Sequence, residues 1–253
     1  MIKIILSGCC GTMGQAVAAA AAERDDCEIV AGLDRNMNKP TNFPVYTDIH
    51  AIAEDFDVII DFSTPKALDG LLEFALTRKK PLVIATTGFS EDQIGLIENA
   101  AAAIPVFFSA NMSLGVSLMR ELAVIAARVL GGHFDIEIVE KHHNKKIDAP
   151  SGTALMLANA VSQAVPYDAK YVYDRHSSRV ARDKADIGIH SIRGGTIVGE
   201  HEVIFAGQDE LLTLTHTAYS KGIFAYGALS AAIFIKGQKS GLYEMSDLTQ
   251  NHE

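Results

Sequence analysis

Short apolar runs alternate with helical patterns through the first 110 residues, and this alternation limits the possible folds of the chain more than any other feature. The runs are rich in Val and Ile and bounded by Gly, Pro, Asp or Ser, as buried parallel strands are. They are Ile2–Leu6, Glu28–Leu33, Val58–Phe62, Leu82–Ala85 and Val106–Phe108. The helical segments are Gln15–Arg24, a segment from Thr64-Pro65 towards Arg78, and Glu91–Ala102, which Ser90 and Gln93 open as a capping box. This order predicts a Rossmann-type, doubly wound α/β domain with a parallel sheet.

The pattern changes after residue 110. A long helix, Ser113–Leu130, is expected to end at Gly131-Gly132. Four runs then alternate apolar and polar residues, as strands with one covered face do. They are Phe134–His143, Gly188–Arg193, Ile197–Phe205 and Leu211–Thr217, with a helix at Thr153–Ala164 and a charged loop at Lys170–Asp186 among them. These segments predict a second, α+β domain with an open mixed sheet, whose uncovered face is expected to form oligomer contacts.

The final helical pattern, Gly222–Lys236, follows the second sheet and needs a surface to pack against. We expect it to return to the first domain, with a Gly241-Leu242-Tyr243 tail after it. Residues 1–110 and 219–253 are therefore expected to form a dinucleotide-binding domain. Residues 111–218 are expected to form a substrate-binding and oligomerisation domain.

Composition excludes several classes of protein. With 22 Lys and Arg against 31 Asp and Glu, the net charge is −9, so the basic surplus of a general nucleic-acid binder is missing. No apolar run approaches the roughly 18 residues of a membrane helix. The three cysteines (Cys9, Cys10 and Cys27) are too few for a disulfide scaffold and favour a reducing compartment, so we expect a cytoplasmic protein.

A glycine-rich turn follows the first expected strand. In Gly8-Cys9-Cys10-Gly11-Thr12-Met13-Gly14, glycines let the backbone approach a pyrophosphate, which the start of the next helix attracts. Asp34, 20 residues past Gly14, suits the ribose hydroxyls of NAD, and Arg35 suits the 2′-phosphate of NADP. The alternatives are a plain turn and solvated loop charges. For the two adjacent cysteines, small side chains in a tight turn are favoured over a redox pair.

Five side chains that can carry positive charge lie within six residues, although the protein is acidic overall. They are Lys141, His142, His143, Lys145 and Lys146. Ser151-Gly152-Thr153 then opens a helix, so the segment predicts a site for a carboxylate, with a histidine able to donate a proton. A solvated turn is one alternative. A metal site is another, but neighbouring strand residues point to opposite faces and no third ligand is near in sequence, so no metal is expected. Glu137 is interpreted as a surface charge of the strand.

The stretch from Glu137 to Ala154 meets every fixed position of E-x-x-E-x-H-H-x-x-K-x-D-x-P-S-G-T-A. That pattern resembles the signature of the dihydrodipicolinate reductase (4-hydroxy-tetrahydrodipicolinate reductase) family. Further blocks resemble the family in the same order along nearly the whole chain. They include Thr86-Thr87-Gly88-Phe89, Ala110-Asn111, Arg193-Gly194-Gly195, Val198-Gly199-Glu200-His201 and Ser240 to Met245.

The resemblance implies NADH- or NADPH-dependent reduction of a cyclic unsaturated imine dicarboxylate in lysine and diaminopimelate biosynthesis, by a homotetramer. It implies that His142 donates or accepts a proton and that Lys146 is a second proton donor. The implied substrate contacts are His143, Ser151, Gly152 and Thr153. The implied cofactor contacts are Gly8, Cys9, Cys10, Gly11, Thr12, Met13, Asp34, Arg35, Ala85, Thr86, Thr87, Ser109, Ala110, Asn111 and Met112.

The chain departs from the family pattern in two respects. Cys10 and Ala85 stand where glycine is commoner, and Thr64 stands where some members have arginine, which leaves the preference between NADH and NADPH open. The sequence is also compatible with two other functions. One is another small-substrate dehydrogenase, although no reactive cysteine lies beyond the glycine-rich turn. The other is a nucleotide-sensing protein without catalysis, which would not need His142 and Lys146 together.

Overall fold

The computed structural model describes residues 1–37 and 39–250. The chain divides into two compact units. Met1–Leu114 and Lys221–Glu253 make up the first, and Gly115–Ser220 make up the second. Within the described residues, no helix is both long and apolar enough to cross a membrane.

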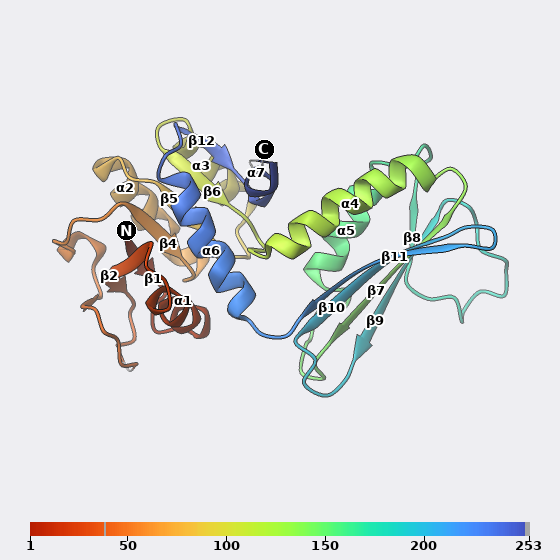
Figure 1. The fold of residues 1–253 in the computed structure, drawn as a ribbon, viewed down its shortest axis with the longest axis horizontal. Helices are drawn as coiled ribbons and strands as arrows, with labels where there is room; N and C mark the ends of the chain where they lie inside the picture. Colours follow the sequence, from red (N-terminus) through yellow and green to blue (C-terminus); the bar gives the residue numbers. More distant parts are fainter. Residues whose placement is uncertain (38, 251–253) are drawn as a thin grey trace. The chain divides into compact units, whose positions relative to one another are not determined.

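The first unit is built on a seven-stranded sheet in the order β12-β6-β5-β4-β1-β2-β3, with every neighbouring pair parallel (Figure 1). Its strands are β1 (Ile2–Ser7), β2 (Cys27–Leu33), β3 (Val45–Tyr46), β4 (Val58–Asp61), β5 (Leu82–Ile84), β6 (Pro105–Phe108) and β12 (Gly241–Tyr243). Its helices are α1 (Thr12–Ala22), α2 (Leu68–Arg78), α3 (Glu91–Ala101), α6 (Gly222–Ile235) and α7 (Met245–Gln250), with short 3₁₀ turns at Ile49–Ala51 and Pro65–Ala67.

Both faces of this sheet are covered. Ile4 and Leu6 of β1 pack into a core with α1 and α6, whereas Ile5 packs into a second core with α2 and α3. Successive strand residues point to opposite faces, so one fully apolar strand supplies both cores. The predicted Rossmann-type, doubly wound domain is therefore confirmed. The expected tail at residues 241–243 is in fact strand β12, which pairs with β6.

The second unit has a five-stranded mixed sheet in the order β11-β10-β7-β9-β8. Its strands are β7 (Asp135–His142), β8 (Lys170–Val172), β9 (Asp186–Arg193), β10 (Gly199–Ala206) and β11 (Leu211–Ala218). Helices α4 (Leu114–Leu130) and α5 (Gly152–Ser162) lie on one face of it, where their apolar side chains form the core with Ile136 and Ile138 (Figure 1). The opposite face is open, as predicted. Lys170–Asp186 is not a loop throughout, because it contains β8 and the first residue of β9.

Candidate active site

Strand β7 places Glu140 and His142 on the face of the sheet that the helices cover. Burial alternates strictly along this strand, and these two residues follow Ile136 and Ile138 on the buried side. The Glu140 residue has no exposed surface and His142 is 9% exposed. His142 Nδ1 lies 2.6 Å from Glu140 Oε2. The C-terminal end of this amphipathic strand thus carries a buried carboxylate–imidazole pair.

Neighbouring residues hold the Glu140 carboxylate in place by hydrogen bonds. Arg193, at the end of β9, donates to both oxygens at 2.6 and 2.8 Å, and the Ser151 N–H donates at 3.2 Å. Burial alone would raise the pKa of Glu140, but the hydrogen bonds from Arg193, Ser191 and His142 outweigh it and lower the pKa to about 2. Glu140 is therefore ionised at neutral pH.

The His142 ring sits between opposing influences. Burial lowers its pKa, while the hydrogen bond and the charge of Glu140 act to raise it; the positive charges of Lys146 and Arg193 add to the lowering. Since Nδ1 faces the carboxylate, Nε2 is the nitrogen left for chemistry. A Cβ atom on Gly199 would lie 3.2 Å from that nitrogen, so glycine at this position preserves the room beside it.

A second histidine completes the buried cluster. His201 of β10 lies with its ring 5.3 Å from that of His142, at an interplanar angle of 74°. Burial and the neighbouring His142 lower the pKa of His201 to about 4, so the ring is neutral at pH 7. Its Nε2 is 2.9 Å from Ser151 Oγ, and that oxygen also accepts from Ala154 N as the cap of α5. The side chain of Ser151, predicted as a substrate contact, is thus buried, and its hydroxyl is already hydrogen-bonded to two groups of the protein.

The other predicted residues lie around this cluster. Lys146 Nζ is 2.8 Å from the exposed Asp148, and its charge is felt at His142. Gly152 and Thr153 are the first two residues of α5, and a Cβ on Gly152 would meet no described atom within 4 Å. His143 is half-buried, and its Nδ1 has no hydrogen-bond partner among the described residues.

The predicted cluster of five cations is not one cluster in the structure. Lys141 lies on the open face of the sheet, where its ammonium binds Glu200 and, at 2.8 Å, Glu202. These carboxylates raise its pKa to about 12. Lys145 is exposed. The reason is strand parity, because Lys141 and His142 are adjacent and so point to opposite sides of the sheet.

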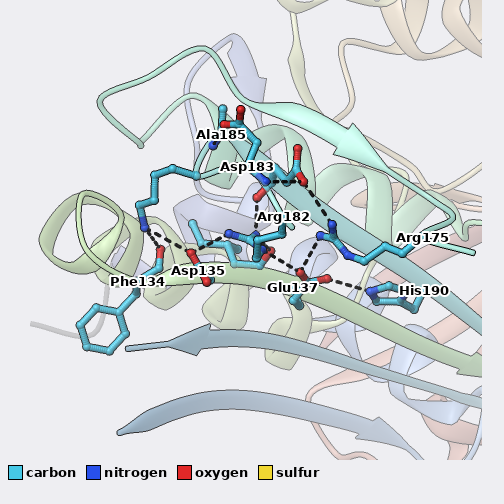
Figure 2. A network of polar contacts seen from close by, with 11 residues as sticks. Phe134, Asp135, Glu137, Arg175, Arg182, Asp183, Ala185 and His190 are labelled. Carbon is cyan, nitrogen blue, oxygen red and sulfur yellow. Dashed lines mark hydrogen bonds and ion pairs between the residues drawn. The ribbon is translucent and has the colours of Figure 1, made fainter. Parts of the chain in front are cut away.

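The open face also carries an ionic network centred on Glu137 (Figure 2). Glu137 accepts from His190 at 2.7 Å and from Arg175 at 3.0 Å, and Arg182 lies 3.4 Å away. Glu137 is therefore a partly exposed charge of the strand, as interpreted from the sequence, and it is paired with neighbouring side chains. Its partners come from β9 and from the segment between β8 and β9, so the network ties that segment to the sheet.

In the first unit, the glycine-rich turn joins β1 to α1 as predicted. Gly8 has a φ of +77°, and a Cβ on it would lie 2.4 Å from the Phe62 carbonyl oxygen, so glycine is required. Asp34 follows β2 and accepts from the backbone N–H of Cys10 at 2.9 Å. Gly8, Gly11, Asp34 and Arg35 line one cavity of about 880 Å³. A cavity of that size bordered by a helix start, an acid and a base fits a dinucleotide.

Several predicted cofactor contacts are core residues. Cys9 has no exposed surface, and burial raises the pKa of its thiol to about 12. Its Sγ is 3.9 Å from that of Cys10, and both are free thiols. Met112 and Ala85 are also buried. The backbones of these residues border the strand ends, but their side chains serve packing. Other predicted cofactor contacts keep at least part of their surface exposed, either at the start of α1 (Thr12 and Met13) or in the loop after β6 (Ser109, Ala110 and Asn111).

A buried carboxyl ties two of these loops together. Asp61, at the end of β4, accepts from Thr86 Oγ1 at 2.7 Å and from Ser63 Oγ at 2.5 Å. Burial raises the pKa of Asp61 above its usual range. Thr86 is therefore oriented by Asp61, and Thr87 follows it at an exposed position.

The two halves of the chain match the two parts of one enzyme family. Residues 2–112 match the family described as dihydrodipicolinate reductase, N-terminus, and residues 115–249 match dihydrodipicolinate reductase, C-terminus. The chain belongs to the dihydrodipicolinate reductase family. The resemblance inferred from the sequence is confirmed, and the protein is an oxidoreductase of a family that uses a nicotinamide cofactor.

Individual members of the dihydrodipicolinate reductase family align along the full chain. The 4-hydroxy-tetrahydrodipicolinate reductase of Caldanaerobacter subterraneus subsp. tengcongensis is 53% identical over 250 residues, covering 99% of both chains. That of Clostridium tetani is 46% identical and covers 97% of this chain and 96% of the relative. A solved dipicolinate-bound dihydrodipicolinate reductase from Paenisporosarcina sp. TG-14 has a TM-score of 0.81 at 26% identity, covering 96% of this chain and 97% of that one.

The sequence reasoning missed three residues of the reductase's buried cluster, namely Glu140, Arg193 and His201. Glu140 carried a usable signal, because one residue separates it from His142 along a strand, which puts both on one face. Arg193 and His201 lie 51 and 59 residues beyond His142 in the chain. Only the pairing of β9 and β10 with β7 brings them to it.

Proposed function

We propose that the protein is a 4-hydroxy-tetrahydrodipicolinate reductase, which uses NADH or NADPH to reduce a cyclic unsaturated imine dicarboxylate to tetrahydrodipicolinate in lysine and diaminopimelate biosynthesis. Membership of the dihydrodipicolinate reductase family supports the reaction class. The observation that carries the chemistry is His142, whose Nδ1 faces a buried carboxylate and whose Nε2 is kept clear of a neighbouring side chain by glycine at position 199.

The second unit supplies groups suited to a dicarboxylate. Gly152 and Thr153 open α5, and the N-terminus of a helix attracts an anion. Lys146 adds a positive charge next to His142. A bound dicarboxylate favours the protonated imidazole, so His142 takes up a proton as the substrate binds and can deliver it from Nε2 to the reduced ring. In this proposal His143 contacts the substrate and Lys146 is a second proton donor.

The first unit is proposed to hold the dinucleotide, which supplies the hydride when bound. The glycine turn offers backbone N–H groups at the start of α1, and Asp34 and Arg35 line the same cavity. Asp34 suits a ribose and Arg35 a 2′-phosphate, so we propose that both cofactors are accepted.

We further propose that the reductase is a cytoplasmic homotetramer assembled through the open face of the second sheet. That face presents exposed apolar side chains, Leu211 at 65% and Ile192 at 46% exposure, as well as the Lys141 ion pairs. The three free thiols are consistent with a reducing compartment. Sedimentation equilibrium of the purified protein is expected to give the mass of four chains, and a monomer would contradict the proposed assembly.

The proposed activity is tested by following cofactor oxidation with substrate made in situ from pyruvate and aspartate semialdehyde by a separate synthase. NADH and NADPH are compared, and pyridine-2,6-dicarboxylate, the ligand of the solved relative, serves as competitor. Oxidation that depends on substrate and is blocked by this planar dicarboxylate is expected. If both cofactors bind and neither is oxidised, a nucleotide sensor or a different dehydrogenase replaces the reductase.

His142→Gln tests the role of the imidazole in the same assay. Loss of a positioned proton donor is expected to lower kcat by about 10²–10⁴-fold and to leave the Kd for NADH within about twofold of wild type. Lys146→Gln is paired with Lys145→Gln, because the two lysines are adjacent but only Lys146 has its charge felt at His142. Lys146→Gln is expected to raise KM for substrate and, because it removes the proposed second proton donor, to lower kcat, whereas Lys145→Gln is expected to have little effect. An unchanged kcat in His142→Gln would contradict the mechanism.

A further inference from the structure

We propose that Glu140 is a positioning residue for the reduction, because its carboxylate fixes the orientation and tautomer of His142. This inference rests on the proposed function, since it assigns a role to a group that acts through the proposed proton donor. Glu140 does not reach the substrate side of the ring. It contacts Nδ1 at 2.6 Å, whereas Nε2, on the other side of the ring, faces Gly199.

The contact determines which ring nitrogen carries the proton in the neutral state. A carboxylate only accepts, so Nδ1 must carry the hydrogen that it shares with Glu140 Oε2. The neutral ring therefore presents an unprotonated Nε2, and a proton taken up there lies on the side of the ring away from Glu140. Without the carboxylate the two tautomers compete, and the ring can rotate about its side-chain bonds.

The carboxylate is itself fixed in place. Arg193 binds it with two parallel hydrogen bonds, and the N–H of Ser151 adds a third. Two-pronged binding by a guanidinium sets both the position and the plane of a carboxylate. The charged and titratable groups that act on His142 are Glu140, Arg193 and Lys146, with the neutral His201 at its ring. Of these, only Glu140 is negative, so it alone favours the protonated imidazole.

The second face of the same strand provides a matched control. Glu137 also accepts from a histidine, His190, and from an arginine, Arg175, but it lies on the open face and is partly exposed. Glu140→Gln and Glu137→Gln thus remove the same charge from the same strand and from similar partners. Only the first change alters the environment of His142.

The test measures kcat, KM and the pH profile of the wild type, Glu140→Gln, Glu140→Asp and Glu137→Gln. Loss of positioning is expected to lower kcat of Glu140→Gln by about 10²-fold or more, with KM for NADH within about threefold. The pKa of the proton donor in the kcat/KM profile is expected to fall, because the one group that raises it is gone. Glu140→Asp keeps the charge and is expected to recover part of the loss, and Glu137→Gln is expected to behave as wild type.

A measurement without turnover separates this inference from the proposed function. The NMR titration of the His142 ring in the full-length protein is expected to show a lower pKa and a changed tautomer in Glu140→Gln, and neither change in Glu137→Gln. If the wild type reduces no substrate but the titration shifts, the proposed function fails and the role of Glu140 towards His142 stands. An unshifted titration, or a kcat of folded Glu140→Gln within threefold of wild type, overturns the inference. If Glu140→Gln does not fold, the tautomer of the neutral His142 ring in the wild type decides, and a proton on Nε2 in place of Nδ1 overturns the inference.

Discussion

The close contact between α1 and the glycine turn makes Gly14→Ala a quantitative test of the proposed dinucleotide site. A Cβ on Gly14 would lie 2.1 Å from the Gly8 carbonyl oxygen and 2.6 Å from Cys9 Cα. Contacts below 3.0 Å are essentially never seen for real Cβ atoms, so helix and turn must separate by roughly 1 Å. Overpacking of this kind lowers the free energy of unfolding by about 1–3 kcal/mol, whereas the better helix propensity of alanine raises it by about 1 kcal/mol. With backbone meeting backbone the cost lies at the upper end, which gives a net loss of about 2 kcal/mol.

Gly95→Ala is the matched control because it makes the same substitution inside α3, where the added Cβ would meet no described atom within 4 Å. It is expected to raise the free energy of unfolding by about 0.5–1 kcal/mol, since only helix propensity changes. Urea unfolding measures both variants, and the fluorescence of bound NADH gives the Kd. Gly14→Ala is also expected to weaken NADH binding by about tenfold or more, because Gly8 and Gly11 line the cavity. If Gly14→Ala were as stable as Gly95→Ala and bound NADH normally, the reasoning from the contact would be refuted.

Two further predictions follow from buried carboxyls. Burial raises the pKa of Asp61, so the folded state binds its proton more tightly than the unfolded state and loses stability as the pH rises from about 3.8. Asp61→Asn cannot ionise and is free of this loss. Urea unfolding is therefore expected to show that the free energy of unfolding of Asp61→Asn, relative to wild type, is higher at pH 7 than at pH 4. The Glu140 pKa of about 2 lies below the usual 4.5, so this residue contributes about 3 kcal/mol at neutral pH, which is lost as the pH falls from 4.5 towards 2. The stability gap between wild type and Glu140→Gln should therefore narrow over that window, and a constant gap would contradict the assignment.

Elements with strong periodicity were predictable from the sequence, and very short ones were not. Five of the seven strands of the first sheet were expected near their observed bounds, because each is an apolar run between turn residues. β3 and β12 have only two and three residues, too few to show a period, and they exist because neighbouring strands offer free edges. β8 lies in a segment so rich in charge that its composition indicates a loop.

The proposed site was predictable where one segment holds it and unpredictable where the fold assembles it. Residues 141–153 were predicted as a site from their composition and from the helix start at Ser151. The same composition counted Lys141 with His142, which the pleat separates. Cys9 was also predicted as a cofactor contact, although its side chain points into the core against Gly32. A Cβ atom added to Gly32 would lie 2.6 Å from the Cys9 sulfur.

The two sides of β7 show why composition alone cannot assign chemistry. Glu137 with His190 and Arg175, and Glu140 with His142 and Arg193, are the same three residue types in contact. On the open face water competes for each charge and screens it, so such pairs contribute little to stability. On the covered face the carboxylate has no exposed surface, and its charge acts on one imidazole nitrogen through a fixed contact. Helices α4 and α5 therefore make the difference, because they cover one side of the strand and exclude water from it. On that side an ion pair can direct the proton of a histidine.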